Sequence, residues 1–230
     1  MSSITDLGRP GYATHFLGGV IPTEVTGSSE NSGTAATVVG KVGGVVGLIT
    51  GTSDGNRSQI VTGLNLKAED GSLDFTALVM SLTAITVRAM FVGWTDTVSI
   101  ENPIELSGVT LTSTATDAVG FVYDTAATTD VWYIQGVKAD VDTALKAAVS
   151  PFTGGSLVPV AGTYQELRMI TNVDGLTSFY IDGMFVGQVA ASVTPTVLLT
   201  PTVLVETRTT AAATVYVDAL AYEGGSDTTP

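Results

Sequence analysis

The sequence contains no cysteine, which excludes disulfide bonds, thiol catalysis and thiolate metal ligands. It contains a single histidine, His15. One histidine provides neither a histidine metal cluster nor a catalytic triad unless the fold brings suitable partners to it, so we interpret His15 as structural. From these residues we expect no catalytic residue, no metal site and no cofactor.

Charge is scarce and mostly negative. Only 13% of the residues are charged, and nine basic residues face 22 acidic ones for a net charge of −13. The basic residues are scattered singly, whereas nucleic acids and anionic membranes are bound by basic patches. We therefore expect neither of these as a partner. With so few charges, either solubility rests on Thr, Ser, Gly and Asn, or partners cover much of the surface.

Long apolar runs are missing as well. No run approaches the roughly 18 residues that indicate a transmembrane helix, and none is expected. The first residues have neither a basic region nor an apolar core, so no secretory signal is visible. A chain of 230 residues without a Pro- or Gly-rich linker fits one large all-β domain.

Short β-branched and aromatic runs separated by turn residues make up most of the chain. The stretch 164–222 shows this best, with Asp174-Gly175 and Asp182-Gly183 between such runs. Asp-Gly tolerates the positive φ angles of a type I′ turn, so residues 179–181 and 184–186 are predicted to form a hairpin. With further runs at 197–205 and 214–222, we expect an antiparallel meander.

Other segments extend this pattern. We expect a Gly-interrupted strand at 36–50, a pair formed by 73–80 and 84–94, and a pair formed by 119–124 and 131–137. Residues 101–116 contain Pro103 and are expected to form a long surface loop. Residues 139–148 form the only plausible helix, with a helical turn or an irregular loop as equal alternatives.

About eleven or twelve strands result, and no helix is long enough for a parallel crossover. The fold predicted from these strands is an all-β, antiparallel sandwich of two sheets. Each sheet is expected to bury one face and expose the other, around a core about 10 Å thick.

Seven short motifs lie at 89–96, 117–124, 130–133, 137–140, 164–168, 179–187 and 215–220. They resemble motifs of concanavalin-like jelly rolls of the lectin and laminin-G type, and more narrowly those of tailed-phage structural proteins, so the fold implied is an all-β, antiparallel two-sheet jelly-roll sandwich. The resemblance covers residues 15–222. It implies a non-enzymatic virion protein that decorates or cements the outer capsid shell and is made in the host cytoplasm. The major capsid protein is then a partner.

Further expectations follow from this assignment. The domain should span 15–223, between a flexible N-terminal arm at 1–14 and a polar tail at 224–230. The working unit is expected to be a homotrimer, because capsid shells offer three-fold positions. The alternative is a carbohydrate-binding module of a tail fibre or spike, and a third hypothesis is a jelly-roll hydrolase.

Catalytic and metal-binding patterns are weak. Glycosidases need paired carboxylates, but Glu101 and Glu105 flank Pro103, and Glu166 and Glu206 stand alone, so we interpret these acids as solvated. Residues 172–175 and 54–56 supply too few oxygen ligands for calcium, and turn formation explains them.

Four aromatic residues are the candidate contacts for a partner or a glycan: Trp94, Tyr123, Trp132 and Tyr133. The resemblance places them on the central strands. Aromatic rings there either stack on sugars or fill the core or a subunit interface, and the sequence leaves both interpretations open.

Overall fold

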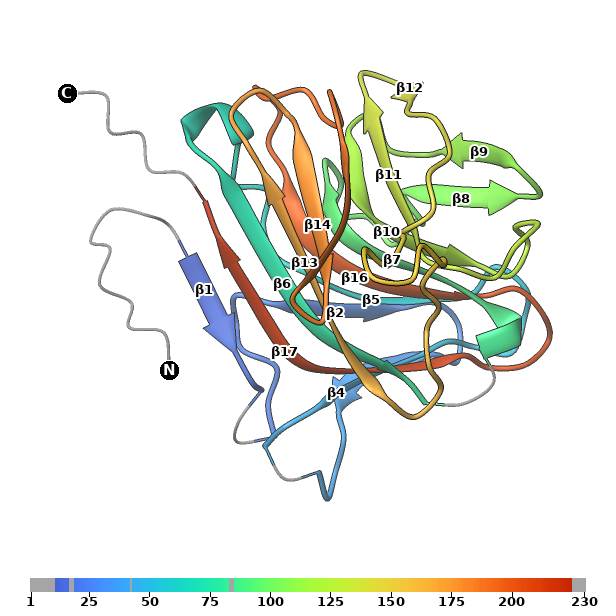
Figure 1. The fold of residues 1–230 in the computed structure, drawn as a ribbon. Helices are drawn as coiled ribbons and strands as arrows, with labels where there is room; N and C mark the ends of the chain where they lie inside the picture. Colours follow the sequence, from blue (N-terminus) through green and yellow to red (C-terminus); the bar gives the residue numbers. More distant parts are fainter. Residues whose placement is uncertain (1–10, 17–18, 42, 83–84, 225–230) are drawn as a thin grey trace.

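The computed structural model describes residues 11–16, 19–41, 43–82 and 85–224 (Figure 1). Two large antiparallel sheets pack as the layers of a sandwich, which confirms the predicted jelly-roll class. The helical elements in these ranges are two 3-10 turns, η1 (Ala68–Asp70) and η2 (Ile85–Val87). None of the described helices is long and apolar enough to span a membrane.

The first sheet has eight strands. Its order is β15-β14-β13-β6-β17-β4-β3, and β1 also pairs with β17. The strands are β1 (Gly11–Thr14), β3 (Thr34–Thr37), β4 (Val46–Ile49), β6 (Leu73–Ser81), β13 (Tyr164–Thr171), β14 (Thr177–Ile181), β15 (Met184–Val189) and β17 (Thr214–Glu223).

The second sheet has seven strands in the order β12-β11-β10-β7-β16-β5-β2, and β8 and β9 form a separate hairpin. The strands of the second sheet are β2 (Thr26–Ser29), β5 (Arg57–Val61), β7 (Arg88–Thr95), β10 (Ala118–Asp124), β11 (Tyr133–Lys138), β12 (Val141–Asp142) and β16 (Thr200–Thr207). The hairpin is β8 (Ile104–Ser107) and β9 (Thr110–Ser113). The described residues form seventeen strands, against the eleven or twelve expected.

Strand pairing agrees with the sequence where the signal is local. β14 and β15 form the predicted hairpin, with Ile181 opposite Met184. Asp182 and Gly183 have φ angles of 51° and 75°, as a type I′ turn requires. The predicted pairing of 119–124 with 131–137 is confirmed by β10 and β11.

Two predicted pairings are wrong because the chain crosses between the sheets. β6 pairs with β13 and β17, whereas β7 pairs with β10 and β16, so residues 73–80 and 84–94 lie in different layers. The stretch 164–222 is a meander only through β15. β16 then joins the seven-stranded sheet, and β17 returns beside β6.

Three segments differ from their expected conformations. Residues 101–116 contain the β8–β9 hairpin instead of a long loop, with β8 beginning directly after Pro103. The segment 139–148 is not helical: it carries β12, and Ala147 bridges to Tyr133 along the edge of β11. The expected strand at 36–50 is a pair, β3 and β4.

The predicted N-terminal arm also differs in part. Residues 11–14 were assigned to it, but they form β1 and pair with the end of β17 from Leu220 to Glu223. Backbone hydrogen bonding to an edge strand orders this segment despite its lack of hydrophobic periodicity. The other arm residues, 1–10, and the tail residues 225–230 lie outside the described residues.

The two sheets are buried differently. Along β6, from Leu73 to Val79, buried side chains alternate with half-buried ones, so the eight-stranded sheet exposes its outer face. In contrast, every residue of β7, β10 and β16 is buried. The expectation that each sheet exposes one face is therefore wrong for the seven-stranded sheet.

A second apolar cluster explains this burial. Phe91, Val122 and Leu204 on the outer face of the seven-stranded sheet pack with Ile104 and Leu106 of β8. Leu145 and Ala147 of the 139–148 segment also pack against this cluster. Figure 1 shows β8 and β9 on the right, beyond β10 and β11. We call this the sealed face, and the outer face of the eight-stranded sheet the open face.

Candidate functional site

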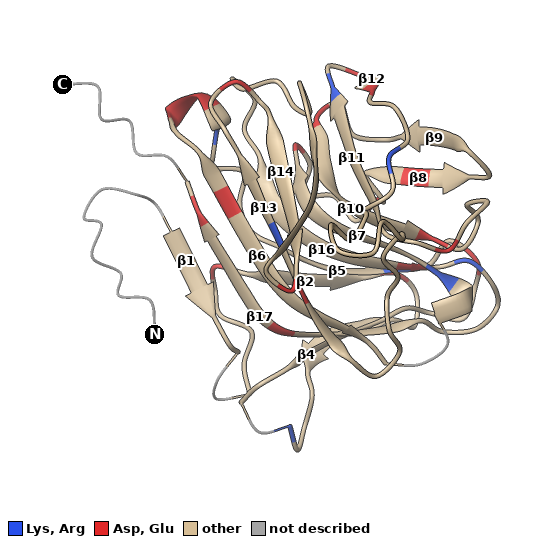
Figure 2. Cartoon of the chain, viewed as in Figure 1, with Lys and Arg blue, Asp and Glu red and all other residues tan. Residues whose placement is uncertain are grey.

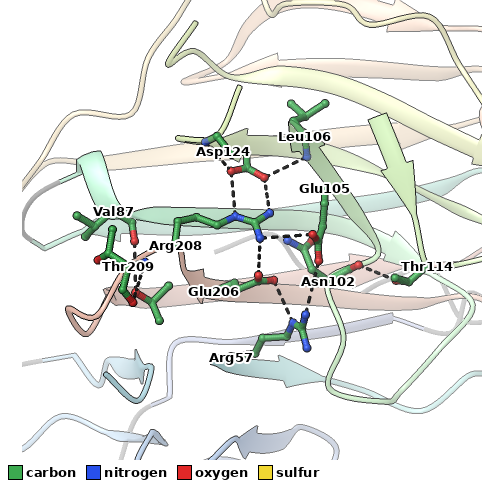
Figure 3. Close-up of polar contacts among 12 residues, drawn as sticks. Arg57, Val87, Asn102, Glu105, Leu106, Thr114, Asp124, Glu206, Arg208 and Thr209 are labelled. Carbon is green, nitrogen blue, oxygen red and sulfur yellow. Dashed lines mark hydrogen bonds and ion pairs between the residues drawn. The ribbon is translucent and has the colours of Figure 1, made fainter. Parts of the chain in front are cut away.

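The densest group of charged side chains lies at one end of the sealed face (Figure 3). Two arginines gather four carboxylates from three strands and one loop. Register places Glu206 of β16 opposite Arg57 of β5 on one side and Ala89 of β7 on the other, and Ala89 lies opposite Asp124 of β10. We call this the Arg–carboxylate cluster, and its members are Glu30, Arg57, Glu105, Asp124, Glu206 and Arg208.

Arg208 is the centre of the cluster. Its Nε donates to Oδ1 of Asp124 at 3.1 Å and its Nη2 to Oδ2 at 2.5 Å, a bidentate arrangement. Its Nη1 donates to Glu206 at 2.6 Å and to Glu105 at 3.4 Å. The side chains of Asp124 and Glu206 are 0% and 1% exposed, so both carboxylates depend on this cation.

Arg57 completes the cluster from the neighbouring strand. Its Nε donates to the second oxygen of Glu206 at 3.0 Å. Its guanidinium also lies 3.5 Å from Glu105 and 3.7 Å from Glu30. Its side chain is 24% exposed, so solvent screens these contacts more than those of Arg208.

Burial and the neighbouring charges shift the pKa values of this cluster in opposite directions. Burial raises the pKa of Glu206 above its ordinary value, although Arg208 and Arg57 pull it down. Burial alone would lower the pKa of Arg208, but Asp124, Glu206 and Glu105 together raise it. The pKa of Arg57 is likewise raised by its carboxylates against the effect of burial. Both arginines therefore stay charged.

The cluster fastens the β8–β9 hairpin to the sheet. Asp124 accepts a hydrogen bond from the backbone N–H of Leu106 at 3.0 Å, and Glu105 on the same strand contacts both arginines. Each carboxylate of the cluster has a cation or a backbone donor as partner. Such an arrangement stabilises a fixed geometry and leaves no carboxylate in it free for general acid–base catalysis.

The sequence predicted little of this cluster. Glu105 and Glu206 were interpreted as solvated acids, but Glu206 is buried and both are ion-paired. Glu101 lies in the bend before Pro103 and does not join them. The one local signal is the spacing of Glu206 and Arg208, because alternate strand residues share a face.

Polar side chains continue along the sealed face beyond the cluster. Register aligns Thr202, Gly93, Gly120 and Gln135 across four strands. The ring of Phe91 lies over the two glycines: a Cβ added at either one would meet a ring carbon within 3 Å. Four residues here have buried side-chain atoms without a hydrogen-bond partner in the described part of the chain: Thr95, Asn102, Gln135 and Thr202.

A second acidic pair, Asp96 and Asp117, follows β7 and precedes β10. Asp96 accepts a hydrogen bond from the backbone N–H of Asp117 at 3.1 Å, and Asp117 accepts others from Thr194 and Ala139. Burial raises the pKa of Asp96; the hydrogen bond from the Asp117 backbone N–H opposes this shift, and the charge of the Asp117 carboxylate adds to it. These bonds bind loops to the ends of the two strands.

Three of the four candidate aromatic residues lie in the core between the sheets: Trp94, Tyr123 and Trp132. The ring of Trp132 lies 5.9 Å from that of Tyr123, and its Nε1 donates to Gln165 at 3.2 Å. The Tyr123 hydroxyl donates to the Ile85 carbonyl at 2.9 Å, and burial raises its pKa to about 12.

Tyr133 belongs instead to the apolar cluster of the sealed face and is 6% exposed. Its hydroxyl donates to the Thr129 carbonyl at 3.1 Å. The four rings therefore lie where core packing places them, and in this chain they do not form an exposed platform for sugars.

The acidic turns are explained by local hydrogen bonding. Asn172 Oδ1 accepts from the backbone N–H groups of Asp174 and Leu176 at 3.0 and 2.9 Å, an Asx turn. Within the described ranges, no group of three or more His, Asp or Glu side chains is placed to hold a metal ion.

Comparison with known proteins supports the fold. No family model matches the sequence, and no curated protein does. Among solved structures, a protein of unknown function from Shewanella oneidensis is 11% identical at a TM-score of 0.61, over 100% of this chain and 92% of that one.

Two further structural neighbours differ from each other in function, since one is a carbohydrate recognition domain and the other is a lyase. The carbohydrate recognition domain of Emp47p is 7% identical at a TM-score of 0.57, over 95% of this chain and 97% of that one. An endo-β-1,4-glucuronan lyase from the fungus Trichoderma reesei is 12% identical at a TM-score of 0.60, over 93% of this chain and 94% of that one. At such identities the likeness shows the shared concanavalin-like jelly roll, which both lectins and enzymes use.

Proposed function

We propose that the protein is a non-enzymatic structural subunit of a tailed-phage particle, where it decorates the outer capsid shell. The observation that carries this proposal is the sealed face. The apolar cluster and the β8–β9 hairpin cover the outer face of the seven-stranded sheet, and arginines neutralise the carboxylates gathered there. The sequence resembles the jelly rolls of phage structural proteins, and this resemblance is the reason for proposing a phage particle.

The working unit proposed is a homotrimer. A trimer repeats one contact around an axis and matches the three-fold positions of a shell. Only 13% of the residues are charged, which suits a surface that is partly covered by neighbours.

Binding to shells tests this function. Shells assembled from the major capsid protein of the same phage are mixed with the purified protein and separated on a density gradient. We expect the protein to migrate with the shells at saturable stoichiometry, and an excess of free protein to displace labelled protein. Migration apart from the shells at high micromolar concentration would contradict decoration.

Carbohydrate binding is the second candidate. It is favoured by the buried polar atoms of Thr95, Asn102, Gln135 and Thr202, whose hydrogen-bonding capacity is unused, and by the carbohydrate recognition domain among the structural neighbours. Polyhydroxylated ligands satisfy such groups, but the segment 96–116 must first move aside. A glycan array tests this candidate, with Gln135→Ala as the variant that should lose any binding found.

A further inference from the structure

The open face remains accessible to solvent. Apart from Met80, which is buried, the outward side chains of β6, β13, β14 and β17 are half-buried or exposed, while the inward ones are buried. In Figure 1, β1, β17 and β6 of this sheet lie side by side on the left.

The open face carries a row of aromatic and arginine side chains. Register places Phe185 opposite Tyr180, Tyr180 opposite Arg168, and Arg168 opposite Thr76. The rings of Phe185 and Tyr180 lie 5.7 Å apart, and the Arg168 guanidinium lies 6.0 Å from the Tyr180 ring centre. Tyr and Arg are the residues that most often dominate binding energy at protein interfaces.

This row is held in position before any partner binds. Arg168 donates from Nε to Asp74 Oδ1 at 3.0 Å, and its Nη2 pairs with the other oxygen of that carboxylate. The exposed fraction of Phe185 is 45% and that of the Arg168 side chain is 43%. A rigid, exposed aromatic row loses little side-chain entropy when it is covered.

The charges of the open face select the chemistry of the partner. Its eight strands carry four acids, Asp74, Glu166, Asp218 and Glu223, and one base, Arg168, which is already paired with Asp74. Figure 2 shows the same excess of red over blue on β6, β13 and β17. A second copy would bring acids against acids, since the chain has a net charge of −13.

We propose that the open face is the docking surface for a protein partner whose contact area has an apolar centre and a rim of lysine and arginine. The apolar centre covers Tyr180 and Phe185, and the basic rim meets Glu166 and Glu223. The identification of this partner as the capsid shell rests on the proposed function, whereas the chemistry of the docking surface does not.

The test compares matched surface variants for affinity to the assembled shells. Phe185→Ser and Tyr180→Ser are expected to weaken binding by about tenfold or more, while Phe152→Ser stays within about twofold of the native affinity. Phe152 is the matched control, because it is 82% exposed in a loop between β12 and β13. Thermal melting confirms that each variant is folded.

Charge reversal gives a second matched pair. Glu166 on β13 and Asp142 on β12 are both exposed acids, but only Glu166 lies on the open face. Glu166→Lys is expected to weaken binding and reduce its dependence on salt, while Asp142→Lys leaves both unchanged. If the native protein binds and all these variants bind equally well, the docking surface is wrong and the proposed function stands.

If the native protein does not bind shells, the proposed function fails and a peptide titration decides the docking surface. A short peptide of alternating lysine and leucine is added to labelled protein, alongside its counterpart with glutamate for lysine. The proposal requires that the lysine peptide shift the NMR signals of Tyr180 and Phe185 more than that of Phe152, and that the glutamate peptide leave all three in place. If only the signals of other residues shift, or if no signal shifts, the proposed docking surface is wrong.

Discussion

Arg208→Met tests whether the Arg–carboxylate cluster holds the sealed face together. Methionine keeps most of the volume and removes the cation. Asp124 then keeps only the backbone donors of Leu106 and Ala126, at 3.0 and 2.9 Å, for a carboxylate that is 0% exposed. Removing one partner of a buried ion pair typically costs about 3 to 5 kcal/mol, and we expect a loss of stability in that range.

Arg57→Met provides the comparison. Without the Arg57 guanidinium, Glu206 stays paired with Arg208 at 2.6 Å. The other two carboxylates near Arg57, those of Glu30 and Glu105, are partly exposed. Partly exposed ion pairs contribute little, so the expected cost is about 1 to 2 kcal/mol.

Urea unfolding at neutral pH measures both free energies of unfolding. Hydrogen exchange at the Leu106 amide reports whether the hairpin loosens, and faster exchange in Arg208→Met than in Arg57→Met is expected. If Arg208→Met costs less than about 1 kcal/mol, or less than Arg57→Met, the cluster does not fasten the hairpin.

Three further predictions use other parts of the structure. Gly183 has φ of 75° with open space around it, so Gly183→Val should lower stability by about 1–3 kcal/mol through backbone strain, and an unchanged melting temperature would contradict the turn. Burial raises the pKa of Glu206, so its contribution to stability is present below its ordinary pKa of 4.5 and is lost as pH rises through the raised value. The native protein should therefore lose stability relative to Glu206→Gln as the pH rises above 4.5, and an opposite trend in urea unfolding would refute this sign. Light scattering on the full chain and on a chain without residues 1–10 tests the trimer, and a monomer at high micromolar concentration for the full chain would contradict it.

The sequence predicts local features of this fold well. The β14–β15 hairpin follows from Asp182-Gly183 because the turn and both strands lie within a dozen residues of each other. The choice of partner strands does not follow in the same way. β6 and β7 are neighbours in the chain, yet each pairs with strands from distant parts of it, because both sheets of a jelly roll are built from alternating segments.

The candidate site was harder to predict for the same reason. Arg57 and Glu206 lie 149 residues apart in the sequence, and neither has a neighbour that signals the ion pair. Of the four candidate aromatic residues, three lie on strands and Trp132 directly precedes β11, but which face a strand residue occupies changes with a shift of one residue. Burial on both faces of the seven-stranded sheet depends on the β8–β9 hairpin, which the sequence presented as a loop.

Hydroxyl-radical footprinting of the protein, free and bound to shells, tests most directly which face docks. Radicals oxidise aromatic side chains according to their exposure to solvent. We predict that binding slows the oxidation of Tyr180 and Phe185 on the open face and leaves Phe152 oxidised at the rate seen in free protein. Protection of Phe152 with unchanged oxidation of Tyr180 and Phe185 would contradict docking through the open face.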